Sequence, residues 1–392
     1  MSKWSLVPLG NILTERQEVP PDYALASGEI PIIAKIGFDD GRIQLRAEGQ
    51  TKTGMILIRP GDFVVSGINA AKGAIAIYGE ENTRSIAATI HYGAYIPQKE
   101  RIDISFLWWL LRSRTFRGLL LEYVPGGVKT ELKSKRLLPI PIPLPSLPEQ
   151  QRIVARIETL SAKIEEAREL RRHAAGEAEA HLGATSLALF SSLRPLSSVG
   201  EVCEVIDPNP SHRYPVYVPK GIPIISSSEF VGDDGIDPTR SRQVPEAFYE
   251  ATLGRYKVCG GDVVFSRKGK VGYARLHPDA KRLAMTHTLC VMKPDRARIE
   301  PRYLLHFARS PFFLEELTGT MNPNVGVPTL GLGVIRDANI PLVHLSEQRR
   351  IVAYLDGLQA KVDELKKLQF ETAAELAALL PSILDKAFKG EL

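Results

Sequence analysis

A short basic loop in the second half of the chain has the residue types that bind phosphate groups. Residues Ser266–Tyr273 read Ser-Arg-Lys-Gly-Lys-Val-Gly-Tyr, so Arg267, Lys268 and Lys270 lie among flexible glycines directly after an expected strand. Lys and Arg side chains supply phosphate contacts, and polar side chains can reach base edges in a nucleic-acid groove. The loop is therefore a candidate for phosphate or base-edge contact, and the alternative is a solvated surface loop.

Other basic residues are further candidates for phosphate contact. The first-half stretch that aligns with the loop, Ser66–Gly73, keeps only Lys72, so a common role for the two loops is not indicated. The remaining candidates are Lys129, Lys133, Lys135, Arg136, Arg240, Arg242, Lys281 and Arg282. For each of them the alternative interpretation is a solvated surface cation. Asn322 and Asn324 could read an adenine edge, but beside Gly326 we favour a turn.

Several fragments resemble catalytic motifs without completing them. Asp207–Pro210 lacks the second proline and the aromatic residue with which an adenine methyltransferase stacks on a flipped base. Gly331–Gly333 has no adjoining strand, helix and acidic ribose ligand, and Pro278–Lys281 has no identifiable second metal-binding acid. His91 and His287 end apolar stretches and are expected to be structural. The sequence also has no phosphate-binding loop of the nucleotide hydrolases, so we predict no catalysis, cofactor site or metal site in this chain.

The elements that must position these residues include two near copies of one segment. Pro143–Leu170 and Pro341–Leu368 lie 198 residues apart and align without a gap, with 14 of 28 positions identical. This spacing is too wide for a solenoid, so the repeat predicts a duplicated unit in which a globular half is followed by a helix. The length of 392 residues also indicates more than one domain.

Both copies have the apolar spacing of a coiled-coil helix. Within each copy, the predicted seam positions are separated by alternating steps of four and three residues. They are Ile153, Ile157, Leu160, Ile164 and Ala167 in the first copy, and Ile351, Leu355, Leu358, Val362 and Leu365 in the second. The first helix is expected over Pro148–Phe190, with a length of about 60 Å from the helical rise. The second is expected from Glu347 to near Leu380, where Pro381 would kink or end it.

Each predicted helix has one apolar stripe, and packing one stripe on the other is the simplest way to bury both. The first helix leads from the first half of the chain into the second, and the second helix leads out of the second half. If the two halves lie at opposite ends, the helices must run antiparallel, with each half docked at one end. The alternative is that each helix packs on its own domain.

The two halves outside the helices have β patterning and share short anchors. Apolar runs bounded by Gly or Pro occur at Ile30–Ile33, Met55–Ile58, Asp62–Val65, Ile222–Ile225 and Asp262–Phe265. The matching anchors are Gly61–Ser66 with Gly261–Ser266, Phe106–Ser113 with Tyr303–Ser310, and Gly127–Thr130 with Gly326–Thr329. Between these anchors the sequences diverge. A shared scaffold with different surfaces is what two related readers of different targets would show.

Composition indicates an ordinary globular protein in a reducing compartment. Hydrophobic residues make up 44% of the chain and charged residues 24%. The formal net charge is +5, and the excess of positive charge lies in the two halves outside the helical segments. Cys203, Cys259 and Cys290 are far apart, which indicates neither a disulfide framework nor a zinc site. The N-terminus lacks the apolar region of a signal peptide, and Ile104–Leu111 is too short to span a membrane. We therefore expect a cytoplasmic protein.

The chain resembles the specificity (S) subunit of type I restriction–modification systems over essentially its whole length. The likeness rests on the GD-x-V-x-S strand of each half, and on the helix starts Pro143–Ile157 and Pro341–Leu355, which share EQ-x-RIVA. It also rests on the tail Leu380–Leu392. The tandem helix starts together with this tail are the specific part of the resemblance.

The resemblance implies an α+β fold with a pseudo-twofold internal repeat. Two mixed α/β target recognition domains would be separated by two long conserved helices that form an antiparallel coiled coil. On this basis we expect target recognition domain 1 at residues 1–147 and the central conserved helix at 148–192. Target recognition domain 2 is expected at 193–340, and the C-terminal conserved helix at 341–392.

The resemblance also implies a function. Each domain would read one half of a bipartite double-stranded DNA target. The coiled coil would set the half-site spacing and hold two methyltransferase (M) subunits and, through them, two restriction (R) subunits. S-adenosylmethionine would serve adenine N6 methylation in M, and ATP and Mg would serve R. The alternatives are the target-recognition subunit of a related system with fused methylase and nuclease, a catalytic methyltransferase, and a coiled-coil adaptor.

Overall fold

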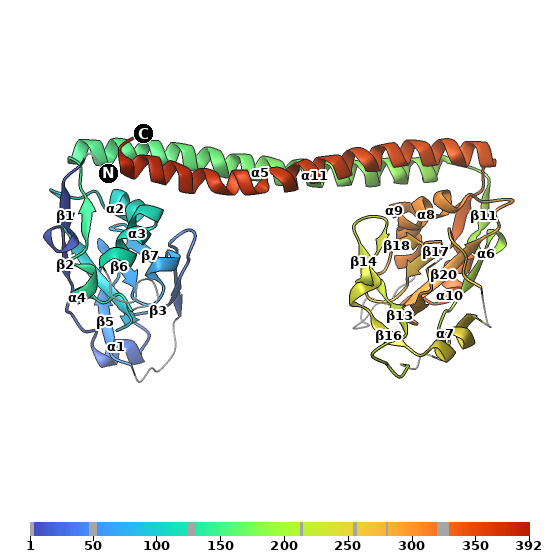
Figure 1. The fold of residues 1–392 in the computed structure, drawn as a ribbon, viewed down its shortest axis with the longest axis horizontal. Helices are drawn as coiled ribbons and strands as arrows, with labels where there is room; N and C mark the ends of the chain where they lie inside the picture. Colours follow the sequence, from blue (N-terminus) through green and yellow to red (C-terminus); the bar gives the residue numbers. More distant parts are fainter. Residues whose placement is uncertain are drawn as a thin grey trace. The chain divides into compact units, whose positions relative to one another are not determined.

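The computed structural model describes residues 4–46, 53–123, 131–211, 215–253, 257–279, 281–319 and 329–392. The chain divides into two compact units. Unit 1 comprises Met1–Arg171 and Phe370–Leu392, and unit 2 comprises Arg172–Gln369. The long helices α5 (Leu147–Ser192) and α11 (Leu345–Lys389) cross both boundaries, so each unit contains one end of each helix (Figure 1).

Each unit is built around a four-stranded antiparallel sheet. The strand order is β2-β9-β6-β7 in unit 1 and β12-β20-β17-β18 in unit 2. The strands are β2 (Leu13–Glu15), β6 (Asp62–Ser66), β7 (Ile75–Tyr78), β9 (Tyr92–Pro97), β12 (Cys203–Ile206), β17 (Val263–Ser266), β18 (Ala274–Leu276) and β20 (Leu289–Pro294). The strands β6 and β17 carry the repeated GD-x-V-x-S segment and are buried along their whole length, so this segment forms the centre of each core.

A second, mixed sheet lies farther from the long helices in each unit (Figure 1). Its order is β4-β3-β8-β5 in unit 1 and β16-β13-β19 in unit 2, and the pairs β3/β8 and β13/β19 are parallel. These strands are β3 (Ile32–Ile36), β4 (Ile43–Arg46), β5 (Met55–Ile58), β8 (Ile86–Thr89), β13 (Ile222–Ile225), β16 (Arg242–Val244) and β19 (Ala284–Met285). Each apolar run that predicted a strand overlaps one of the observed strands, so those predictions are confirmed.

Short strand pairs and small helices complete the two units. The pairs are β1 (Leu6–Pro8) with β10 (Pro141–Pro143), β11 (Leu196–Ser198) with β21 (Asn339–Pro341), and β14 (Phe230–Val231) with β15 (Gly235–Ile236). The small helices are α1 (Asp22–Ala26), α4 (Ser134–Leu137), α6 (Val199–Val202), α7 (Glu246–Leu253) and α10 (Leu332–Asp337).

A pair of helices lies between the main sheet and the long helices in each unit (Figure 1). They are α2 (Ile104–Leu111) and α3 (Arg114–Tyr123) in unit 1, and α8 (Pro301–Arg309) and α9 (Pro311–Thr318) in unit 2. A serine directly before the second helix of each pair caps that helix. Ser113 accepts a hydrogen bond from the Phe116 N–H at 3.2 Å, and Ser310 accepts one from the Phe313 N–H at 3.3 Å. The matching anchors Phe106–Ser113 and Tyr303–Ser310 therefore lie mainly in corresponding helices, α2 and α8.

The repeated Gly-Asp pair forms the same turn in both units. Gly61 and Gly261 have φ values of +91° and +85°, a backbone region that glycine adopts without a steric penalty. The aspartate after each glycine accepts a hydrogen bond from the backbone N–H three residues before it, at 2.8 Å in both units. The motif thus starts the central strand with a turn that satisfies its own backbone.

A buried glutamine attaches the start of each long helix to its unit. The Gln150 amide oxygen accepts from the Asp103 N–H at 2.8 Å, and its NH2 group donates to the carbonyls of Arg101 at 3.0 Å and Pro145 at 2.9 Å. Gln348 makes the corresponding three bonds in unit 2, at 2.9, 2.9 and 2.8 Å. Both side chains are fully buried. The shared EQ pair of the repeat therefore contains the residue that fixes where each helix begins.

The first long helix begins and ends within two residues of its predicted bounds, but the second does not end near Leu380. Helix α11 continues through Pro381 to Lys389. The predicted stop was wrong because Leu384, Ala387 and Phe388 are buried in the core of unit 1. This burial offsets the hydrogen bond that a proline cannot donate inside a helix.

The two long helices run antiparallel within each unit. In unit 1, Ile153 near the start of α5 shares a core with Phe388 near the end of α11, whose ring lies 5.4 Å from that of Phe106. In unit 2, Ile351 near the start of α11 shares a core with Phe190 near the end of α5, and the Phe190 ring lies 5.4 Å from Tyr303. Each unit therefore packs against both helices, rather than against its own helix alone.

The predicted seam positions are buried or half-buried in a pattern that repeats between the copies. The buried members are Ile153, Ile157, Ile164, Ile351, Leu355 and Val362, and the half-buried members are Leu160, Ala167, Leu358 and Leu365. In unit 2 an ion pair between Lys366 and Glu179, at 2.9 Å, also joins the two helices.

The tryptophans and cysteines of the chain can report the unfolding of the two units separately. All three tryptophans of the chain lie in unit 1, and all three cysteines lie in unit 2. Cys203 and Cys290 are buried, and burial raises the pKa of both thiols to about 12. Tryptophan fluorescence therefore reports the unfolding of unit 1, and thiol labelling of the two buried cysteines reports the unfolding of unit 2.

We predict that each buried glutamine stabilises only its own unit. Gln348→Ala leaves three backbone groups without their partner, so it should lower the free energy of unfolding of unit 2 by about 1–3 kcal/mol. Urea titrations with thiol labelling should show a lower midpoint for Gln348→Ala, and tryptophan fluorescence should show one for Gln150→Ala. The exposed neighbour Gln151 provides the control, as Gln151→Ala. Unchanged midpoints in both variants would contradict the role assigned to these residues.

Candidate nucleic-acid interface

A cavity of about 890 Å³ in unit 1 gathers cationic and aromatic side chains. It lies between α2 and α3 on one side and the long helices on the other. The charged residues that line it are Lys72, Arg112, Arg114, Arg117, Arg168, Asp39, Asp40 and Glu165. Five cations against three carboxylates leave an excess of two positive charges. Trp108 and Trp109 also line the cavity, so it combines phosphate-binding groups with aromatic side chains.

Two of these arginines hold the backbone that carries Lys72. Arg112 stacks on the Trp108 ring at 4.2 Å and donates to the carbonyls of Gly73, at 2.8 Å, and Asp39. Arg117 donates to the Ala71 carbonyl at 2.7 Å. Burial lowers the pKa of Arg112, yet an arginine keeps its charge in proteins. Lys72 itself is exposed on the short turn between Gly73 and Ala71, where it is available to a ligand in the cavity.

The sequence reasoning selected Lys72 at this site but missed the arginines. Arg112, Arg114 and Arg117 occur within six residues, which is a visible basic cluster. Arg168 comes to the same cavity from α5, and it pairs with Glu165 one turn earlier at 2.5 Å. Only the docking of α5 beside α2 and α3 brings these residues together, and that docking has no local signal in the sequence.

The other basic candidates of unit 1 lie away from the residues that line this cavity. Lys133 and Lys135 are exposed around α4, and Lys133 lies 3.7 Å from Glu131. Arg136, also exposed, donates to the Glu131 carbonyl at 2.9 Å. Lys129 lies outside the described residues, as do Asn322 and Asn324 of the second half. Contact of the basic residues with nucleic acid stays a prediction, as does the turn favoured for the two asparagines.

The basic loop of unit 2 begins directly at the end of β17, as the sequence predicts. Gly269 and Gly272 have φ values of +75° and +92°, so the loop uses the conformational freedom of both glycines. Lys270 is exposed and lies 5.7 Å from the centre of the Tyr273 ring. Lys268 is half-buried and forms an isolated antiparallel bridge with Thr329. The loop therefore presents Lys270 and the edge of Tyr273 to solvent.

Arg267 has a different environment from the one expected for a surface cation. Its side chain is only 6% exposed, and it donates to the Asp207 carboxylate at 2.7 Å and to the Leu330 carbonyl at 3.3 Å. In this structure Arg267 therefore supports the interior of unit 2, because a guanidinium buried against a carboxylate does not face a ligand. Asp207 belongs to the segment that resembled a methyltransferase motif, and the structure gives it this structural pairing.

The position of unit 1 that corresponds to Arg267 is Gly67, and its backbone makes the corresponding hydrogen bonds. Arg267 donates its N–H to the Thr288 carbonyl at 3.0 Å and accepts from the Leu330 N–H at 2.8 Å. Gly67 donates to the His91 carbonyl at 2.7 Å and accepts from the Leu132 N–H at 2.7 Å. A Cβ atom on Gly67 would lie 3.0 Å from the His91 carbonyl oxygen, so a larger residue there would have to shift its neighbours slightly.

The remaining basic candidates of unit 2 lie around its second sheet. Arg242 in β16 stacks on Tyr217 at 4.7 Å, and Arg240 is exposed in the turn before this strand. Arg282, just before β19, lies 4.9 Å from the Tyr249 ring and forms an ion pair with Glu246. Strand β13 separates β16 from β19, so Arg242 lies in one edge strand of this sheet and Arg282 lies just before the other.

Two further features would bear on function, namely metal-binding clusters and membrane-spanning helices. No group of His, Cys, Asp and Glu side chains suited to a metal ion occurs among the described residues. Among the same residues, no helix combines the length and the apolar composition needed to cross a membrane.

Comparison with known proteins shows the family of the chain. The family described as the type I restriction modification DNA specificity domain matches residues 1–171 and 196–374. The type I restriction enzyme EcoKI specificity subunit of Escherichia coli (strain K12) is 23% identical over 361 residues, which cover 86% of this chain and 75% of that protein.

Solved structures show the same fold. A chain from work on complex assembly and conformational transition of the type I R-M system matches with a TM-score of 0.73 and 25% identity, covering 99% of this chain and 98% of that one. The HsdS subunit from Thermoanaerobacter tengcongensis matches with a TM-score of 0.61 and 24% identity, covering 99% and 97%. Since the family match extends over both halves of the chain, this protein belongs to the type I restriction modification DNA specificity domain family.

Proposed function

We propose that the chain is the DNA sequence-specificity subunit of a type I restriction–modification complex, in which each unit reads one half of a bipartite target. The observation that carries the proposal is one scaffold used twice with different surfaces. The central strands, the capped helix pairs and the buried glutamines repeat between the units. The cations around these shared elements differ in type, position and pairing, which is what reading two different half-sites requires.

Catalysis in this proposal belongs to partner subunits. Two methyltransferase subunits would bind the long helices and methylate adenine N6 with S-adenosylmethionine. Two restriction subunits would join through them and use ATP and Mg. The chain itself would bind DNA and hold these partners. Support comes from the solved relative studied for complex assembly of the type I R-M system.

The cavity of unit 1 supports a specific mode of DNA contact. Lys72 and Arg168 face it from a turn of the globular part and from α5, respectively. A phosphate group in this cavity would meet cations from two sides, and a neighbouring base could approach Trp109. Such contacts position a duplex without reading its sequence, so they would serve affinity in this half-site rather than choice of bases.

Removing one cation that binds a phosphate should weaken DNA binding and reduce its salt dependence. For Lys72→Gln and Arg168→Gln, the slope of log affinity against log salt should become shallower by about 0.9 for each phosphate that is no longer neutralised. The measurement is a salt titration of DNA affinity with the methyltransferase partner present. Arg350→Gln is the matched control, because Arg350 is a highly exposed arginine on α11 that pairs only three residues back, with Glu347. Wild-type slopes for both cavity variants would exclude the cavity as a phosphate site.

The helix pair should act as a ruler for the half-site spacing. Seven residues inserted after Arg171 and seven after Gln369 fall at the boundary of the units in both helices and keep the heptad repeat. The insertion adds about 10 Å of helix, close to three base-pair steps. Mapping of methylated adenines should show the two half-sites unchanged and the gap about three base pairs longer.

The wild-type chain is measured first in the same experiment. A bipartite methylated sequence with one fixed gap is expected when the chain is expressed with its cognate methyltransferase. A continuous target, or the absence of chain-dependent adenine methylation, would overturn the proposed function. An unchanged gap in the insertion variant would overturn the ruler role alone.

A further inference from the structure

An Asp-Asp-Gly turn occurs in both units, and an arginine at the corresponding position of each unit holds it. The turns are Asp39–Gly41 in unit 1 and Asp233–Gly235 in unit 2. Arg112, which follows α2, donates to the Asp39 carbonyl and, at 2.8 Å, to the Gly73 carbonyl shortly before β7. Arg309, at the corresponding end of α8, donates to the Asp233 carbonyl and, at 2.8 Å, to the Ala274 carbonyl. The backbone of each turn is thus fixed in the same way.

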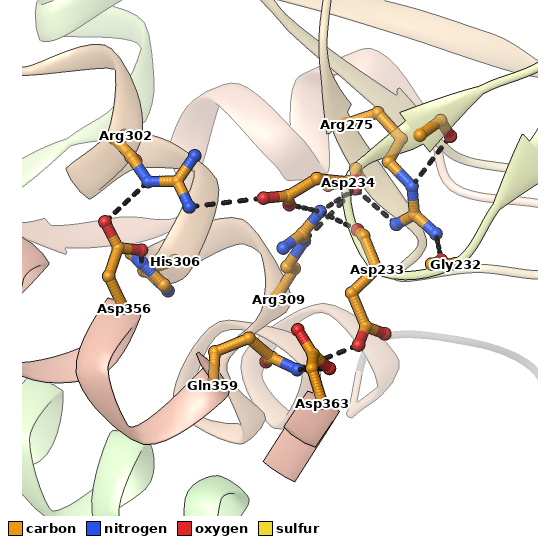
Figure 2. Close-up of polar contacts among 12 residues, drawn as sticks. Gly232, Asp233, Asp234, Arg275, Arg302, His306, Arg309, Asp356, Gln359 and Asp363 are labelled. Atoms are coloured by element: carbon orange, nitrogen blue, oxygen red, sulfur yellow. Dashed lines mark hydrogen bonds and ion pairs between the residues drawn. The ribbon is translucent and has the colours of Figure 1, made fainter. Parts of the chain in front are cut away.

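In unit 2 the side chains of this turn also bind α8 and α11 (Figure 2). Asp234 pairs with Arg309 at 2.9 Å and with Arg302 at 3.2 Å, and both arginines belong to α8. Asp233 accepts from Gln359 of α11 at 2.8 Å and lies 3.8 Å from Lys366. The turn between β14 and β15 is therefore attached to α8 and to α11 through charged side chains.

The network continues into α11 through Asp356. Arg302 donates to one Asp356 oxygen at 2.7 Å, and His306 contacts the other at 2.7 Å. Burial acts to raise the pKa of Asp356 and of Asp234. The bonds of Asp356 to Arg302 and His306, and those of Asp234 to Arg309 and Arg302, outweigh burial and lower both pKa values. Both carboxylates are thus ionised at neutral pH. A continuous chain of contacts runs from the β14–β15 turn through Arg302 to α11.

The β14–β15 turn leads directly into the basic surface of unit 2. The chain passes from β15 into the turn that carries Arg240 and then into β16, which carries Arg242. Phe230 and Ile236, which flank the Asp-Asp-Gly turn, pack against the buried cluster that contains Ile225 of β13. Movement of the turn relative to α11 would therefore move the second sheet and its arginines.

Unit 1 has no counterpart of this network among its described residues, because the corresponding positions hold other residues. From the alignment of the repeats, Ser105 corresponds to Arg302, Trp109 to His306, and Glu158 to Asp356. The cavity of about 890 Å³ occupies this place in unit 1. Asp40 contacts its own turn instead, accepting from the Arg42 N–H at 2.9 Å. In unit 2 a smaller cavity of about 260 Å³ remains beside the turn, lined in part by Asp233, Arg309 and Gln359. The same scaffold thus has a larger cavity in unit 1 and, in unit 2, a smaller one beside a turn that ion pairs attach to the helices.

We propose that Asp234, Arg302 and Asp356 are positioning residues that hold the second sheet of unit 2 at a set place on α11, and so restrict the half-site spacing that the complex accepts. The inference rests on the proposed function, since it concerns the gap between two half-sites. It assigns these residues no contact with bases. Weakening the network should leave the recognised bases unchanged and widen the range of accepted gaps.

The test uses the full-length chain with its cognate methyltransferase. The variants are Asp234→Asn and Asp356→Asn, and the control is Glu158→Gln, the corresponding position of unit 1, which is exposed. Methylation is measured on targets whose gap is one base pair longer or shorter than the wild-type gap. Relative to the wild-type target, use of these altered targets should rise about tenfold in both variants and stay unchanged in the control. Unchanged gap preference in both variants would overturn the proposal.

A second measurement does not depend on methylation. Hydrogen exchange of the Asp237 N–H, which donates to the Glu229 carbonyl at 2.9 Å beside the turn, should become about tenfold faster in Asp356→Asn. Exchange in β17 and β20 should stay as in the wild type. If Asp356→Asn unfolds unit 2, as shown by labelling of Cys203 and Cys290, the milder Gln359→Ala is used in both measurements. Wild-type exchange at Asp237 would overturn the attachment itself, whereas a wild-type chain without a bipartite target would overturn the proposed function.

Discussion

The hydrophobic core of each unit is completed by the last turns of a long helix that begins in the other half of the chain. Phe388 of α11 packs on Phe106 in unit 1, and Phe190 of α5 packs on Tyr303 in unit 2. The two phenylalanines lie 198 residues apart, the same interval as the repeated segments. The long helices are thus part of both cores as well as the connection between them.

Duplication has kept the contacts that build this arrangement and has changed the side chains around them. Gln150 and Gln348 make corresponding sets of three hydrogen bonds, and Ser113 and Ser310 cap the corresponding helices α3 and α9. At the place where unit 1 has a basic cavity of about 890 Å³, unit 2 has ion pairs that join its turn to α8 and α8 to α11, and its cavity there is only about 260 Å³. We infer that the two units offer DNA different surfaces on one scaffold.

Local patterns predicted most of the fold, because strands, heptads and turn glycines have local signatures. The end of α11 was not predictable, since the burial of Phe388 in a distant core decides whether a helix passes Pro381. Basic residues could be identified as candidates, but their burial could not. Arg267 pairs with Asp207, which lies 60 residues earlier in the chain, and Arg168 reaches its cavity only after α5 docks. The sequence contains no short-range signal for either contact.

The exchange of helix ends between the two halves is tested most directly by truncation after Gln369. Removal of Phe370–Leu392 deletes only the part of α11 that belongs to unit 1. Urea unfolding followed by tryptophan fluorescence should then show unit 1 without a cooperative transition. Cys203 and Cys290 should keep their wild-type protection from thiol labelling, because unit 2 retains both of its helix segments. A wild-type tryptophan transition in the truncated chain would contradict the account.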